Sequence, residues 1–467
     1  MNTQMFWRRW SAVLVSGVAL YFLPVPGLNP AQRHLLAIFL ATIVSLVAQP
    51  VPMGVSVLTA MTLLALTGTV APAKVLSGFS NQTTWLIVSA FLFSRAVTLT
   101  GIGMRIAYLF VQRFGRSALS LAYSIVASNV ILAPFIPSDT GRGGAIIYPI
   151  TQSLARALGS EPGATGRTGA FLTLVGFHGN YIASALFLTS MAANPLIADF
   201  AAKIAHVDLS WGRWALATLV PGLLSLTIVP YVIFRLHPPE SRDVSAACAL
   251  ATRELDAMGR LSRNERWLVL VLLGVMAGWI LSPWHGIPNA FVALAGISAL
   301  LVLNVFTWAD LLAESRAWDA LMWFAPLLMM SDVLNESGTI KVLSGAAFAR
   351  LNGWPWQAAF CALVLLYLYV HYAFASMTAH AIALYPGFLA AMVVGGVPPM
   401  LAALLLAYFS NLDAAITHYG TGSAPVFFSP GYLTQGEWWR VGFLISVLNL
   451  FVWLGVGLGW WKLIGLW

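Results

Sequence analysis

Long apolar runs constrain this chain more than any other feature of its sequence. Of its 467 residues, 59% are hydrophobic and only 9% are charged, whereas a soluble protein carries about a quarter charged residues. Runs of about 20 apolar residues, the length that crosses a hydrocarbon core of ~30 Å, recur along the chain. The first four lie near residues 10–27, 33–49, 53–71 and 83–101. The sequence therefore predicts an all-α polytopic membrane protein.

The charged residues are more informative about membrane orientation than about a soluble partner. The net charge is +8, but the basic residues lie in short loops, which favours membrane orientation over nucleic-acid binding. The polar, arginine-rich segment 237–266 is typical of a cytoplasmic linker. Counting spans back from it predicts a cytoplasmic N-terminus. Cys248 and Cys361 form neither a disulfide framework nor a metal-binding spacing.

Two short polar segments in the apolar sequence, residues 137–144 and 375–380, are variants of one pattern. Each reads Ser-x-Thr, then small residues, then Ala-Ile and Tyr-Pro. Flanking half-length helical stretches predict re-entrant hairpins over 118–157 and 356–394, because such broken segments do not span a bilayer. Paired hairpin tips of this kind build the midplane site of secondary transporters.

The duplication predicts about 11 transmembrane helices plus two re-entrant hairpins, arranged in two inverted-topology repeats. An arm helix is expected after the fourth span, over 102–116, where arginines interrupt the apolar residues. The expected divisions are an N-terminal transmembrane helix over 1–30, a first repeat over 31–236, the linker over 237–266 and a second repeat over 267–467.

Each predicted hairpin is followed by a span that is broken midway, at Thr189–Pro195 and at Thr417–Pro425. Proline and glycine interrupt the helical ladder there and free amides and carbonyls, which must be satisfied by protein, water or ligand. Helix N-termini at the tips direct partial positive charge and free N–H groups into the same region. This combination favours an anion such as a carboxylate, with carbonyls left for a small cation.

Asp139 and Arg142 are ionisable residues at membrane depth and are therefore candidates for function. One interpretation pairs them with each other to close the tip. In the other, Arg142 neutralises an anionic substrate while Asp139 holds a cation or a proton. Four histidines in apolar sequence could also titrate near neutral pH; these are His178, His371, His380 and His418.

The motifs together resemble one known family over nearly the whole chain. They are Phe79–Trp85, the tip Ala133–Pro149, Phe374–Ala379, Thr417–Gly420 and the pair Trp438 and Trp439. In order and composition they resemble the divalent anion/sodium symporter family. The similarity is greatest to its branch of citrate/succinate, tartrate/succinate and 2-oxoglutarate/malate exchangers.

This resemblance implies a homodimer in which a transport domain moves against a scaffold domain by an elevator-type shift. The family's Ser-Asn-Thr tips contact substrate carboxylates, and both middle residues depart from that pattern here, as Asp139 and Met377. The implied sodium sites involve Ser138, Asp139 and Ser376. The candidate substrate-binding residues are Ser138, Asp139, Thr140, Arg142, Thr189, Ser376, Met377, Thr378, Thr417 and His418.

We therefore expect a secondary transporter of di- or tricarboxylates, of the succinate, citrate, malate, 2-oxoglutarate or tartrate class. It would work by exchange in the bilayer of a bacterial cytoplasmic membrane, with sodium ions as the candidate coupling ions and no nucleic-acid partner. The chain has no phosphate-cradling loop that would supply hydrolytic energy. One alternative is a sodium- or proton-coupled symporter of another small anion. The other, an intramembrane enzyme, needs a nucleophile and a base within hydrogen-bond reach.

Overall fold

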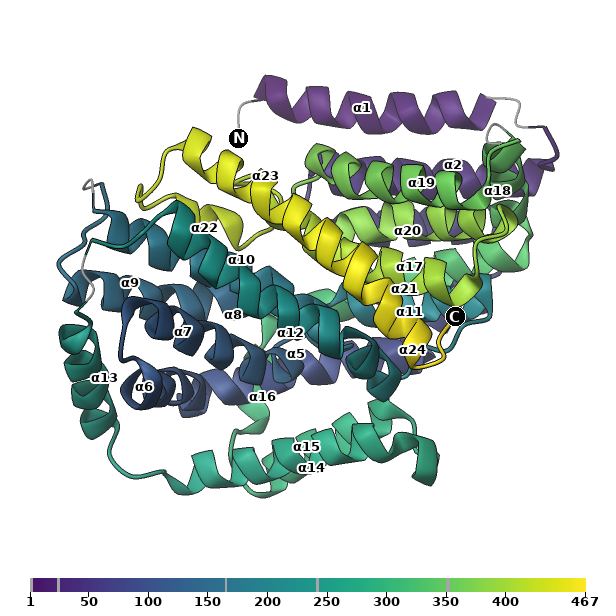
Figure 1. Ribbon diagram of the computed structural model, residues 1–467. Helices are drawn as coiled ribbons and strands as arrows, with labels where there is room; N and C mark the ends of the chain where they lie inside the picture. Colours follow the sequence, from purple (N-terminus) through teal and green to yellow (C-terminus); the bar gives the residue numbers. More distant parts are fainter. Residues whose placement is uncertain (1–2, 23–25, 164–165, 241–242, 350–352) are drawn as a thin grey trace. The chain divides into compact units, whose positions relative to one another are not determined.

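Every regular element in the described part of the chain is helical (Figure 1). The computed structural model describes residues 3–22, 26–163, 166–240, 243–349 and 353–467. Within these ranges, nine helices are long and apolar enough to cross a membrane. Three shorter apolar helices accompany them, over Met53–Leu66, Asn289–Val302 and Pro399–Ala415. The prediction of an all-α polytopic membrane protein is confirmed.

The helices form two compact units that interleave along the sequence. Unit 1 comprises Met1–Val88, Pro195–Leu209 and Ser315–Ser410, and unit 2 comprises Ser89–Asn194, Ser210–Glu314 and Asn411–Trp467. Each unit takes residues from both sides of the predicted linker. The two units thus differ from the two predicted repeats, because the units are defined by contacts and the repeats by a repeated sequence motif. The predicted repeat boundaries stay a prediction.

In unit 1, several of the N-terminal elements pack against α17. Helix α2 contacts both α1 and α3, and α3 contacts α17. Gly78 in η1 lies so close to the Ala325 carbonyl of α17 that a Cβ would clash with it, so only glycine allows this approach. The helices of unit 1 are α1 (Thr3–Phe22), α2 (Pro30–Ala48), α3 (Met53–Leu66), α4 (Pro72–Val75), η1 (Ser77–Ser80), α17 (Ser315–Glu336), α18 (Thr339–Ala349), α19 (Trp356–Val370), η4 (His371–Ala373) and α20 (Met377–Val394).

Helix α10 (Arg167–Leu186) forms the core of unit 2. Every residue from Thr168 to Leu186 is buried, because α7, α9 and α12 pack around this helix. The other helices that lie within unit 2 are α6 (Ile102–Phe114), α7 (Ala118–Leu132), η2 (Ala133–Phe135), α8 (Asp139–Arg142), η3 (Gly143–Ile147), α9 (Tyr148–Ala157), α12 (Trp211–Leu236), α13 (Ser245–Met258), α14 (Arg263–His285), α15 (Asn289–Val302), α16 (Trp308–Ala313), η5 (Asp413–Ala415), α22 (Ala424–Phe428), α23 (Gln435–Phe451), η6 (Val452–Gly457) and α24 (Leu458–Leu463).

The chain passes between the units within α5 (Gln82–Thr100), near the start of α11 (Ala193–Ala205) and within α21 (Pro399–Leu412). It also passes between them in the loops before α12 and α17, at residues 209–210 and 314–315.

The linker contains a helix, α13, that we did not identify in the sequence. The helix predicted over 102–116 is present as α6, and its Arg105 holds the linker by donating to Glu265 Oε1 at 2.6 Å and to the Gly259 carbonyl at 2.8 Å. Glu265 also completes the capping box with Ser262 that starts α14. The linker thus ends where α14 begins at Arg263, and a buried ion pair fixes it to the arm.

Candidate functional site

The first predicted tip is a helix start that a serine caps. Helices α7 and η2 end at Phe135, the chain extends through Pro137, and helix resumes at Asp139. Ser138 is the N-cap, and its hydroxyl oxygen accepts a hydrogen bond from the Gly141 N–H at 2.9 Å. The helical path then continues through the π-helix η3 into α9. An N-terminus therefore opens at the tip, as the sequence predicted.

The second predicted tip, in unit 1, repeats this local structure. Helices α19 and η4 end at Ala373, and Ser376 caps α20 by accepting from the Ala379 N–H at 3.3 Å. The backbone angles agree closely: φ and ψ are −139° and 112° at Ser138, and −152° and 122° at Ser376. The two polar segments thus encode the same turn.

Within each tip, the middle residue of the Ser-x-Thr motif is buried and its neighbours are more open. Asp139 and Met377 are each 4% exposed. Ser138 is half-buried and Thr140 is exposed, while Ser376 and Thr378 are both half-buried. The hydroxyls are therefore the accessible groups of both tips, and the middle side chains belong to the protein interior.

The Asp139 carboxylate fixes the first tip to two other segments of unit 2. Oδ1 accepts from Asn180 Nδ2 of α10 at 2.5 Å. Oδ2 accepts from Thr421 Oγ1 at 2.7 Å and from Ser423 Oγ at 2.5 Å, just before α22. Charge-assisted bonds of this kind are the stronger class of hydrogen bond. Both carboxylate oxygens are thus engaged by protein donors.

The Arg142 guanidinium is completely buried and is also fixed by protein groups. Nε donates to Asn129 Oδ1 at 2.6 Å, and Nη2 donates to Ser184 Oγ at 2.6 Å and to the Asn180 carbonyl at 2.9 Å. Nη1 donates to the carbonyls of Ile136 and Ser190, both at 3.0 Å. These contacts match the five donors of an arginine. Arg142 and Asp139 thus do not bond to each other in the described part of the chain.

The predicted break after α10 is present, because α10 ends at Leu186 and α11 begins at Ala193. Side chains satisfy the carbonyls that the break frees. Asn194 Nδ2 donates to the Ser184 and Phe187 carbonyls at 2.9 and 3.0 Å. Thr189, which is completely buried, donates from Oγ1 to the Pro134 carbonyl at 2.7 Å. The Thr189 hydroxyl therefore connects the break to the tip.

The second predicted break lies between η5 and α22 and contains the hydroxyl of Thr417, which, unlike that of Thr189, is not hydrogen-bonded to a described residue. Thr417 is 3% exposed, and its Oγ1 has no hydrogen-bond partner among the described residues. The next residue, His418, accepts from Trp439 Nε1 at 3.1 Å and packs against Phe428. An unpartnered buried hydroxyl costs free energy, so Thr417 is a candidate to meet a ligand or a water.

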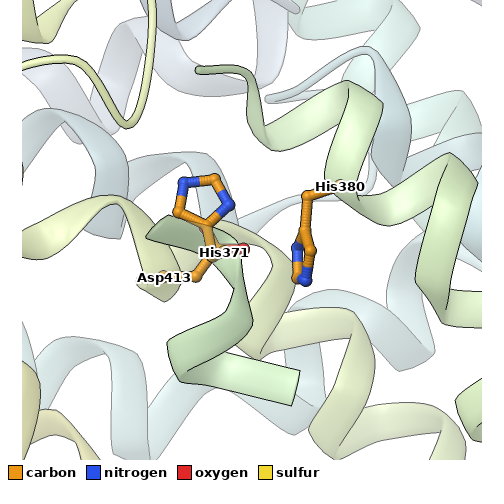
Figure 2. Close-up of side chains that lie close together, drawn as sticks. All are labelled: His371, His380 and Asp413. Carbon is orange, nitrogen blue, oxygen red and sulfur yellow. The ribbon is translucent and has the colours of Figure 1, made fainter. Parts of the chain in front are cut away.

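Two of the four candidate histidines lie together in unit 1. Figure 2 shows the rings of His371 and His380, whose centroids are 5.0 Å apart in an edge-to-face arrangement. Both side chains are completely buried, and the His380 ring also packs against Tyr367 at 4.5 Å. His178, in unit 2, shares a hydrogen bond with the Tyr181 hydroxyl through Nδ1 at 2.8 Å.

Three partners of the first tip were missing from the sequence prediction. Thr421 and Ser423 lie inside the predicted break, so their position was a usable signal. Asn180 lies in α10, whose sequence also contains His178 and Ser184, so no sequence feature singled it out.

Comparison with known proteins identifies the family. Residues 3–467 match the family described as the sodium:sulfate symporter transmembrane region. The chain belongs to this family. The resemblance stated from the motifs is confirmed, and the family is one of transporters rather than enzymes.

Relatives match over most of their length. The chain is 48% identical to "Putative malate transporter YflS" of Bacillus subtilis, over 97% of this chain and 95% of that protein. It is 44% identical to "Dicarboxylate transporter 1, chloroplastic" of Arabidopsis thaliana, over 98% of this chain and 83% of that protein. The crystal structure of the YdaH transporter of Alcanivorax borkumensis has a similar fold, with a TM-score of 0.58 at 15% identity, covering 99% of this chain and 98% of that one.

Proposed function

We propose that this protein is a secondary transporter that exchanges dicarboxylates across the membrane. The observation that carries the proposal is the pair of matching tips, each with a capped helix N-terminus and accessible hydroxyls. Helix N-termini favour anions, and the accessible hydroxyls of each tip can donate hydrogen bonds to a carboxylate. Relatives named for malate and dicarboxylate transport support the same substrate class.

The substrate contacts in this proposal are the hydroxyls that the protein leaves accessible or unpartnered. Ser138 and Thr140 act at one tip, Ser376 and Thr378 at the other, and Thr417 at the second break. Arg142, Asp139 and Thr189 hold the first tip in place, because their polar atoms bond to protein groups. Met377 packs in the interior of its tip, and His418 supports Thr417 through its contact with Trp439.

The exchange mode is supported by the charge balance of the first tip. Asp139 and Arg142 carry opposite charges, and both are satisfied by protein hydrogen bonds, so the tip needs no cation to neutralise Asp139. Sodium-coupled uptake is the second candidate function, because the family description names sodium. In that case, oxygen atoms of Ser138 and Asp139 would contribute to a sodium site at the first tip, and the oxygen atoms of Ser376 to another at the second tip, since sodium prefers oxygen ligands.

We further propose that the protein works as a homodimer in a bacterial cytoplasmic membrane, with its N-terminus in the cytoplasm and an elevator-type movement of its transport domain. The bacterial relative and the arginine-rich linker support this placement. Cysteine crosslinks between a hairpin tip and the scaffold domain should trap the protein with its substrate site open to only one side of the membrane. Full transport by a completely crosslinked protein would argue against a large movement.

Uptake of labelled malate or succinate into proteoliposomes tests the proposed function. Vesicles preloaded with unlabelled dicarboxylate are compared with empty vesicles, each with and without a sodium gradient. Exchange predicts uptake only into preloaded vesicles, with no response to sodium. Uptake into empty vesicles that follows the sodium gradient would establish the symporter instead, and no uptake of any dicarboxylate would reject both.

A further inference from the structure

A cavity of about 580 Å³ opens in unit 2, and none of the tip or break residues described above lines it. It lies where α10 begins, α12 ends and α23 begins, and its lining includes Gly166, Arg167, His237, Gly431, Thr434 and Glu437. The glycines carry no side chains, so they leave room beside the charged groups. The cavity is therefore a pocket with charged walls and open access.

The basic groups of this cavity are available to a ligand. The exposed Arg167 guanidinium makes no hydrogen bond or ion pair with any described residue, and neither does the half-buried His237 ring. The carboxylate in the lining, Glu437, is already engaged, because its Oε2 accepts from the Thr434 N–H at 2.9 Å and from the Thr434 hydroxyl at 2.7 Å. The pocket thus presents the guanidinium charge of Arg167 to a ligand, whereas the carboxylate of Glu437 is already hydrogen-bonded to Thr434.

The position of the cavity along the helices places it at a membrane surface. Helix α12 ends at Leu236 and α23 begins at Gln435. Both α12 and the continuous helical segment Gln435–Leu463, which α23 opens, are long and apolar enough to span a membrane. The ends of such helices lie at the level of the lipid headgroups. Leu236, which lines the cavity, is 39% exposed and presents an apolar surface next to the charged groups. Basic pockets between spanning helices suit anionic headgroups.

We propose that this cavity binds the phosphate group of an anionic phospholipid, with the Arg167 guanidinium and the His237 ring as donors to the phosphate oxygens. The planar guanidinium matches two phosphate oxygens at once. The acyl chains would lie along the apolar surface that begins at Leu236. This role is separate from transport, so it holds whichever anion is carried.

The cavity makes the binding pH-dependent. Burial lowers the pKa of His237 from its usual value of 6.5; the neighbouring Arg440 and Arg167 lower it further, and Glu437 opposes them. The neutral His237 ring is therefore favoured in the free protein. A bound phosphate would favour the imidazolium and raise this pKa, so binding takes up a proton and strengthens as the pH falls.

The test is titration of the purified full-length protein in detergent with short-chain phosphatidylglycerol, read out as thermal stabilisation. Phosphatidylcholine of the same chain length and inorganic phosphate serve as the other arms. We expect stabilisation by phosphatidylglycerol alone and an affinity about five-fold weaker in Arg167→Ala. Arg116→Ala is the matched control, because Arg116 is an exposed arginine outside the cavity.

A second variant gives an independent readout. His237→Gln should bind phosphatidylglycerol with an affinity that no longer rises between pH 7.5 and about pH 5.5. Equal affinities in the wild type and Arg167→Ala would overturn the proposal, as would equal stabilisation by phosphatidylcholine. Tighter binding of inorganic phosphate than of the lipid would also overturn it and assign the cavity to a soluble anion.

Discussion

Asn180 donates to Asp139 twice, from one amide nitrogen to the main-chain carbonyl at 2.9 Å and to the carboxylate at 2.5 Å. Because Asn180 lies in the buried part of helix α10, the position of the first tip is set by the core of unit 2. The tip is therefore a fixed part of its unit rather than a loop attached to it.

Gly143→Ala should lower the stability of the protein. A Cβ at this position would clash with the Asn180 amide and lie 3.2 Å from Ser423 Cβ, so the groups that hold Asp139 would have to shift. Overpacking of this kind costs about 1–3 kcal/mol. Gly144→Ala is the control, since its Cβ would meet Val426 at an ordinary 3.6 Å. Thermal unfolding in detergent compares them, and equal midpoints would contradict the packing argument.

Asp139→Asn should weaken the tip without changing the ion dependence of transport. The substitution removes the charge that strengthens the bonds from Thr421 and Ser423, at a cost of about 1–3 kcal/mol. Because protein donors already satisfy Asp139, we expect the sodium and pH profiles of uptake to match those of the wild type. A shifted sodium profile would instead make Asp139 an ion ligand.

Thr140→Val should raise the KM for dicarboxylate by about ten-fold or more, because it removes an exposed hydroxyl that we assign to a carboxylate. The side chain keeps its shape, and Thr140 caps no helix, so folding should be unaffected. Thr140→Ser should retain transport. Thr62→Val is the control, since Thr62 bonds to the Leu58 carbonyl of its own helix. An unchanged KM in Thr140→Val would remove this residue from the site.

Cys248 should react slowly with maleimide. Burial raises the pKa of its thiol above the usual 9.0, and the charge of Asp243 raises it further. The reactive thiolate is therefore scarcer at pH 8 than in an ordinary cysteine. In a Cys361→Ser background, labelling should be slower than after denaturation, and Asp243→Asn should accelerate it. A folded protein that labels as fast as the denatured chain would contradict this.

The sequence predicted the tips and breaks well, because serine caps, prolines and glycines act locally. The helix caps at Ser138 and Ser376 depend only on neighbouring residues. The break at Thr189–Pro195 likewise follows from its own residues. The family was also predictable, since its motifs are spread over the whole chain.

The sequence could not show where polar side chains point. Whether Asp139 faces a ligand or the interior depends on Asn180 and Thr421, which are distant in sequence. For the same reason, the sequence could not decide whether Arg142 pairs with Asp139 or neutralises a substrate. Helix α13 was missed although Ala247, Ala251 and Leu255 follow a helical period, because the polar residues between them suggested a linker.

Because the middle residue is buried in both tips but has different neighbours in each, the two copies of the turn should tolerate different substitutions. At position 139 the surroundings are an amide and two hydroxyls, so few side chains can replace an acid there. At position 377 the neighbouring space accepts a methionine, a flexible residue that tolerates exchange for others of similar volume. A saturation scan should therefore find that most substitutions at position 139 cause a large loss of transport activity, whereas most apolar substitutions at position 377 cause a small one.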